Sequence, residues 1–290
     1  MNASIIVDFL FKGLEISAPI AFAALGAAFC ERSGVVNIGL EGFMATTSFT
    51  IVWGSFAFHS IWMGLAVAIL TGVVMALIHA VATVTYRVNQ IVSGVAINML
   101  AIGIGRFLSQ KIFNQETQSQ LNPYLFPTVF GINSFAFALI PVTLVAWFLM
   151  YKTRFGLRLR TVGENPEAAD TLGINVRLMR YAGVILSGVM CGLAAGVLYP
   201  SKWVNGMVAG RGFIALAALI FGRWHPVGAV LAALLFGYAD TFRIMFETQI
   251  PIPSQFVQML PYVLAIVVLV GMMGKARAPA ADGIPYEPGE

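Results

Sequence analysis

The chain has 290 residues, of which 59% are hydrophobic and only 10% are charged. A soluble globular domain carries about 25% charged residues, so this chain cannot cover a water-facing surface. Its net charge of +4 comes from basic residues at the ends of apolar stretches, which excludes the basic face of a nucleic-acid-binding protein. Several windows of about 20 residues carry almost no charge and are long enough to cross ~30 Å of hydrocarbon. The composition therefore predicts an all-α polytopic membrane protein.

About nine helical segments follow from the apolar stretches and the turns between them. Two of them, 43–58 and 212–222, are too short to cross a membrane upright, so we expect them to be tilted, broken or re-entrant. The remaining segments are predicted at 6–29, 61–84, 91–110, 135–151, 181–199, 226–245 and 255–273. Together they make a single transmembrane domain over residues 1–290, with a polar tail at 274–290.

The connection between the first two helices, residues 31–42, is too long and too regular in its glycine spacing to be a simple turn. Asn37 and Glu41 are four residues apart, so a helical turn would place them on one face. A carboxylate that enters a membrane span is costly unless it has a partner or faces a polar cavity. Two interpretations stay open: Glu41 pairs with Arg32 or a helix end to fix the fold, or it lines a pathway.

A weak internal repeat relates two halves of the chain, about 6–110 and 181–273. Glu41-Gly42-Phe43 opens one short helix, and Arg211-Gly212-Phe213 opens the other. Inverted repeats with short, glycine-interrupted helices in matching places are typical of transporters, whose pathway lies at the repeat interface. The alternative is chance, since the chain holds 29 Gly and 22 Phe.

Asn98, the deepest polar side chain of 91–110, either bonds across helices or faces the same pathway. The candidate pathway residues are Asn37, Glu41, Asn98, Gly212 and Phe213.

The loop 152–180 holds six of the seventeen basic residues in a chain that is otherwise apolar. If this loop is cytoplasmic, Arg32, Arg87, Arg223, Lys275 and Arg277 fall on the same side, which gives eleven of the seventeen. Because basic residues concentrate on the cytoplasmic side, this bias and nine crossings, both short segments included, place the N-terminus outside and the C-terminus inside. We interpret Lys152 to Arg160 and Arg177 to Arg180 as basic arms that set this orientation.

The centre of the loop reads as a short, well-capped helix over 165–172. Asn165 suits the N-cap, Pro166 the first helical position, Glu167 the positive helix end and Gly173 the stop. So short a helix is marginal alone in water, so we expect a partner or the membrane surface to hold it. The alternative is a solvated hairpin. The candidate docking residues are Glu164, Asn165, Pro166, Glu167, Ala168, Ala169 and Leu172.

No catalytic, cofactor or metal site is apparent in the sequence. His59, His79 and His225 are scattered, without metal-ligand spacing. The segment 271–276 lacks the first Gly and the Ser/Thr of a phosphate loop, and no G-x-S-x-G pattern occurs. We therefore expect a non-enzymatic subunit, and any ATP hydrolysis that drives it would be performed by another chain.

Three segments carry a family resemblance that covers essentially the whole chain: 32–44, 162–174 and 209–237. The chain resembles the inner-membrane permeases of ABC importers for branched-chain amino acids, ribose-type sugars and nucleosides. It looks most like the nucleoside permeases, and its end at 276–290 is similar to tails in that subgroup. The resemblance implies a multi-pass protein of the bacterial plasma membrane that forms the translocation pathway for a small polar solute.

The resemblance also implies partners besides membrane lipid, and no nucleic acid among them. A second permease, identical or different, pairs with this chain, and an extracytoplasmic solute-binding protein delivers the solute. A cytoplasmic ABC ATPase binds 165–172, which corresponds to the family's coupling helix. Alternatives are a sugar or branched-chain amino acid permease, a structural membrane protein, or a stand-alone secondary carrier. The carrier would need an acidic residue at mid-depth, and Glu41, at a span start, is expected to lie too shallow.

Overall fold

The computed structural model describes residues 3–198, 201–247 and 277–287, with isolated positions at 256, 259, 263, 266 and 267. The rest of the predicted span 255–273 and Lys275 lie outside the described residues. The described chain is mostly helical, as predicted. Its helices are α1 (Ala3–Arg32), α2 (Leu40–Phe58), α3 (Ile61–Ala80), α4 (Gln90–Phe113), α5 (Leu139–Lys152), α6 (Arg154–Glu164), α7 (Pro166–Thr171), α8 (Val176–Leu198), α9 (Arg211–Phe221) and α10 (Pro226–Phe246).

Short elements complete the chain between these helices. A π-helical turn, Val81–Thr85, extends α3, and a 3₁₀ turn, Ser134–Ala138, leads into α5. Strands β1 (Thr128–Val129) and β2 (Ile132–Asn133) form an antiparallel hairpin before that turn. Among the described residues, six helices are long and apolar enough to span a membrane, which agrees with the predicted class. They are Ser4–Arg32, Ile61–Thr85, Gln90–Phe113, Ser134–Lys152, Val176–Leu198 and Pro226–Phe246.

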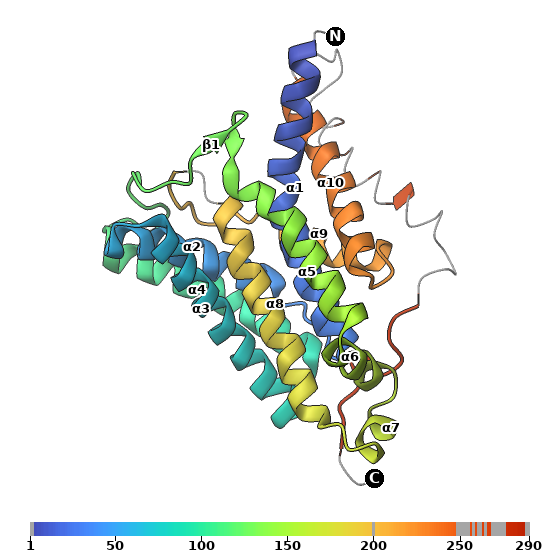
Figure 1. Ribbon diagram of the computed structural model, residues 1–290. Helices are drawn as coiled ribbons and strands as arrows, with labels where there is room; N and C mark the ends of the chain where they lie inside the picture. Colours follow the sequence, from blue (N-terminus) through green and yellow to red (C-terminus); the bar gives the residue numbers. More distant parts are fainter. Residues whose placement is uncertain are drawn as a thin grey trace.

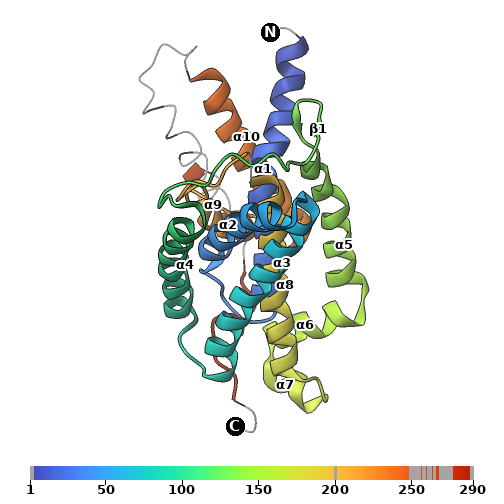
Figure 2. The same ribbon diagram turned by 90° about the vertical axis from the view of Figure 1, so that its left-hand side faces the viewer.

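Helix α1 is the centre of the bundle, and α8, α9 and α10 pack against it (Figure 1). Helix α8 also packs along α3, and α2 lies against α3, α4 and α8 (Figure 2). Small residues make these contacts close. A Cβ on Gly72 of α3 would lie 2.1 Å from the carbonyl oxygen of Gly188 on α8, and the reverse holds too. Lipid gives little hydrophobic drive for helix association, so such close backbone packing holds the two helices together.

The bundle has two distinct ends. One, here called the basic end, carries α6, α7 and the arginines Arg32, Arg87 and Arg223 (Figure 1). Arg32 joins them, because its guanidinium lies 3.3 Å from both a Glu164 carboxylate oxygen and the carbonyl of Arg223. The β1–β2 hairpin marks the opposite, hairpin end. Of the arginines that the charge bias grouped on one side of the membrane, Arg32 and Arg223 therefore meet in the fold.

Both basic arms belong to helices of the bundle, so the alternative of a solvated hairpin does not hold for them. The first arm folds into α6, whose Leu159 and Val162 are buried while Arg154 and Arg158 are exposed. The charges hid its amphipathic period, which places one apolar side against the bundle. In the second arm, Arg180 is only 2% exposed and belongs to the interior of α8.

Candidate functional site

Helices α2 and α9 begin beside each other inside the bundle, and Glu41 joins them. One carboxylate oxygen of Glu41 accepts a hydrogen bond from the backbone N–H of Gly210 at 2.9 Å, and the other accepts from Gly212 N–H at 2.8 Å. Glu41 thus caps the N-terminus of α9, where free N–H groups and the helix dipole favour a negative charge. Of the two partners expected for it, a helix end is confirmed, whereas Arg32 binds Glu164 instead. We call this contact the helix junction.

The helix junction lies deep in the bundle. Helix α9 has eleven residues, so it is roughly 16 Å long. It ends at the level of the basic end of α1, because the Trp224 indole beyond it donates to Glu31 and the Trp224 carbonyl accepts from Arg32. Glu41 therefore lies about one length of α9 away from the basic end of the bundle. Helix α2 thus begins inside the bundle beside α9, and the shallow membrane position expected for Glu41 stays a prediction.

Four of the five candidate pathway residues are involved in internal packing. Asn98 accepts from Gly42 N–H at 2.7 Å and donates to the Ile38 carbonyl at 3.0 Å, so it fixes the start of α2. Gly212 touches Glu41, because a Cβ there would lie 2.5 Å from the Glu41 nitrogen. Asn37 donates instead to the Ser187 hydroxyl on α8 at 3.0 Å. The structure thus brings Glu41, Asn98 and Gly212 together.

Phe213 differs from the other candidates, since its ring is largely exposed on the surface of α9. The non-helical backbone before α2 is held from several sides. Val36 N–H donates to Gln90 at 2.6 Å, and the Val36 carbonyl lies 3.1 Å from a ring nitrogen of His79. Irregular backbone at membrane depth must be satisfied by protein, and these buried side chains do so. Sequence reasoning missed the role of His79 because its partners lie on other segments.

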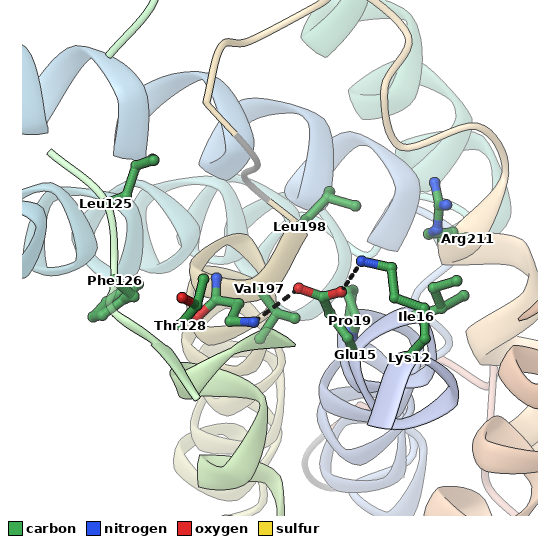
Figure 3. Close-up of a pocket in the computed structure, with 11 residues that line it drawn as sticks. Lys12, Glu15, Ile16, Pro19, Leu125, Phe126, Thr128, Val197, Leu198 and Arg211 are labelled. Carbon is green, nitrogen blue, oxygen red and sulfur yellow. Dashed lines mark hydrogen bonds and ion pairs between the residues drawn. The ribbon is translucent and has the colours of Figure 1, made fainter. Parts of the chain in front are cut away.

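A cavity of about 280 Å³ opens toward the hairpin end (Figure 3). Its walls come from α1, the segment around β1, the end of α8 and the start of α9. Glu15 crosses it, pairing with Lys12 and accepting a hydrogen bond from Asn133 N–H at 2.9 Å (Figure 3). The lining combines polar Lys12, Glu15, Thr128, Asn133 and Arg211 with apolar Ile16, Pro19, Leu125, Phe126, Val197 and Leu198. Arg211 is the first residue of α9, so the floor of this cavity adjoins the helix junction.

At the opposite end, α7 forms the capped helix that the sequence predicted. The Asn165 side chain accepts a hydrogen bond from Ala168 N–H at 2.9 Å, and Pro166 occupies the first helical position. Glu167 and Ala168 are exposed, and Leu172 presents 75% of its surface. Ala169 is fully buried against α6 and α8, so its inclusion in the exposed docking surface is wrong. In so short a helix, residues two positions apart face opposite sides. Residue type alone does not show which side is buried.

Comparisons with known proteins identify the family. The family described as branched-chain amino acid transport system / permease component matches residues 9–272. The chain belongs to this permease family. The permease is 42% identical to the guanosine ABC transporter permease protein NupQ of Bacillus subtilis, over 96% of this chain and 95% of NupQ. It is 43% identical to the nucleoside ABC transporter permease protein NupC of Lactococcus lactis, over 94% of each chain.

The permease also shares its fold with PsaBC from Streptococcus pneumoniae, with a TM-score of 0.54 at 14% identity over 94% of this chain and 93% of the other. Membership of the family makes the chain a membrane-embedded transport subunit of an ABC importer and not an enzyme.

Proposed function

We propose that this permease imports nucleosides across the bacterial plasma membrane. The observation that carries the proposal is the identity of 42–43% with a guanosine permease and a nucleoside permease over nearly the whole chain. A sugar or branched-chain amino acid remains the competing solute class within the family. The helix junction favours a structural role for Glu41 over the ion-coupling role that a stand-alone carrier would need, because both of its oxygens accept backbone hydrogen bonds at the start of α9.

The basic end faces the cytoplasm in this proposal, since arginines concentrate there. The cavity at the hairpin end then opens outward, toward an extracytoplasmic binding protein that delivers the solute. Its 280 Å³ is near the lower end of the ~300–1,000 Å³ typical of small-molecule sites. Polar groups such as Asn133 and Arg211 suit sugar hydroxyls, and apolar walls that include Phe126 suit a flat base. From this cavity the solute would enter the pathway that this chain shares with a second permease subunit.

An uptake assay tests the solute class. The permease is expressed with the ATPase, binding protein and second permease of its own organism in a bacterium that lacks nucleoside uptake. We expect ATP-dependent uptake of radiolabelled guanosine, and an excess of unlabelled ribose or leucine should not reduce it. Uptake of ribose or leucine without guanosine would overturn the proposal, as would guanosine uptake by the purified permease alone in a proton or sodium gradient.

The ATPase is proposed to dock on the exposed face of α7. Leu172→Arg places a charge where an apolar partner surface would press, so we expect the ATPase to be lost on purification while the permease stays folded. The matched control is Leu157→Arg on α6, since this leucine is also exposed at the basic end, by 59% against 75% for Leu172. Retention of the ATPase by Leu172→Arg, or equal loss in both variants, would show that α7 is not the docking helix.

A further inference from the structure

The C-terminal segment 277–287 lies across the basic end of the bundle, far from the last described residues of α10 (Figure 1). It is hydrogen-bonded there through its backbone. Ala281 is buried, and its N–H donates to the Gly163 carbonyl at the end of α6 at 2.9 Å. The carbonyl of Ile284 accepts a hydrogen bond of 2.9 Å from Arg180 of α8. The segment therefore joins α6 to α8, and we call it the strap.

Two acidic side chains of the strap, Asp282 and Glu287, also lie against the bundle. Asp282 lies beside the Glu31 carboxyl at the end of α1 and close to the Arg180 guanidinium. Arg180 is buried and keeps its charge, so it needs the hydrogen bond that the Ile284 carbonyl of the strap accepts. Glu287 pairs with Arg87 in the connection between α3 and α4. Removing the strap would leave Arg180 without its hydrogen-bonded carbonyl.

The strap also contacts the docking helix. The Tyr286 ring packs on an apolar cluster formed by Val162, Ala169, Val176 and Met179, in which Ala169 belongs to α7. The Tyr286 side chain also lies beside Asp170 of α7. Because α7 is only six residues long, it depends on such neighbours to stay helical and in place. A groove beside this contact is lined by Asp170, Ile174, Arg177 and Tyr286, so the tyrosine also borders the surface that a partner would meet.

We propose that the strap positions α7 by fastening it to α1 and α8, so that movement of the docked ATPase reaches the membrane-spanning helices. This inference rests on the proposed docking of the ATPase at α7. Tyr286 is the central positioning residue, since it contacts α7 directly, and Arg180 and Asp282 anchor the strap to the bundle. Without the strap, α7 would still present its exposed face, but it would move independently of the spans.

The test compares Tyr286→Ala with Tyr286→Phe and with Ile284→Ala, whose side chain is exposed. In the complete transporter, we expect Tyr286→Ala to keep its ATPase bound while guanosine uptake per ATP hydrolysed falls about 10-fold, a typical size for coupling between sites. Tyr286→Phe keeps the ring packing and should retain most of the coupling. Ile284→Ala should behave as wild type.

A second readout follows the position of α7 itself. Cys30 and Cys191 are buried, so a single cysteine at exposed Thr171 can carry a spin label. The label should become more mobile in Tyr286→Ala and stay unchanged in Ile284→Ala. Unchanged mobility with unchanged uptake per ATP would overturn the role of the strap, even if Leu172→Arg still releases the ATPase. Complete loss of the ATPase from Tyr286→Ala would also overturn it, because Tyr286 would then be a docking contact.

Discussion

The helix junction and the docking helix α7 are built from similar residues but have different roles. Each begins a short helix with a polar side chain that accepts backbone N–H groups: Glu41 for α9, and Asn165 for α7. At the junction every such contact is made within the chain and inside the bundle. On α7 the cap is internal, but Leu172 beyond it remains 75% exposed.

The difference shows how to separate structure from function in a membrane subunit. In hydrocarbon an unsatisfied polar group is costly, so a polar motif there must first satisfy the backbone. In water the same motif is cheap, and an apolar side chain left exposed beside it indicates a partner. We therefore assign the junction to the fold and α7 to docking, and the predictions below test that division.

The largest effect is expected from Glu41→Ala. It leaves two backbone N–H groups without their acceptor, each worth about 1–3 kcal/mol when buried, so the loss of stability should be roughly 3 kcal/mol. The thermal midpoint of the detergent-solubilised permease measures it. Glu167→Ala on exposed α7 is the control and should leave the midpoint unchanged. A stable Glu41→Ala variant without transport would instead make Glu41 a pathway residue.

Gly212→Ala should have the next largest effect. The added Cβ would lie 2.5 Å from the backbone nitrogen of Glu41, and backbone cannot move aside as a flexible side chain can. Overpacking of this kind costs about 1–3 kcal/mol. Gly103→Ala on α4 is the matched control, because a Cβ there meets nothing within 4 Å. Equal midpoints for the two variants would show that α2 and α9 do not pack as closely as described.

The sequence predicted the parts of this molecule that depend on local chemistry. The apolar lengths located the spans, and Asn165 with Pro166 located α7, because caps and spans are properties of adjacent residues. Helix α6 was missed because its arginines concealed an apolar face that appears only at helical spacing. Ala169 was assigned to the wrong face for a related reason, since a six-residue helix offers little periodicity to read.

The contacts between distant segments could not be predicted in this way. The partners of Glu41 lie about 170 residues further along the chain, and those of Arg180 lie in the strap about 100 residues away. Nothing in the local sequence distinguishes the buried Arg180 from the exposed Arg177. The glycine that permits the junction, Gly212, was flagged by the repeat, so internal symmetry was the one long-range signal available.

Asn165→Ala should have a smaller and purely local effect. Loss of an N-cap costs about 1 kcal/mol, which is enough to destabilise a helix of only six residues. We expect faster amide hydrogen exchange across 167–172 and weaker ATPase binding, with an unchanged thermal midpoint. Asn175 caps α8 through Leu178 N–H at 2.9 Å and supplies the control. Because α8 is long and packed, Asn175→Ala should leave exchange at α7 unaltered, and a change there would contradict the local assignment.

The smallest effect is a dependence of the strap on pH. Burial, with the neighbouring negative charge of Glu31, raises the pKa of Asp282 to about 8, although Arg180 opposes the shift. In a detached strap the group titrates near its ordinary pKa of about 3.9. Detachment therefore releases a proton between these values, so attachment is strongest in acid and weakens as the pH rises to about 8.

A fluorophore on a cysteine at exposed Ala280 would report this through its anisotropy, since Cys30 and Cys191 are buried. We expect lower anisotropy at pH 8.5 than at pH 6.5, with no further fall above that range. Asp282→Asn removes the titrating group that faces Glu31, Arg180 and the Tyr286 side of the strap, and should abolish most of the change. An equal pH dependence of the anisotropy in that variant would show that a group other than Asp282 titrates.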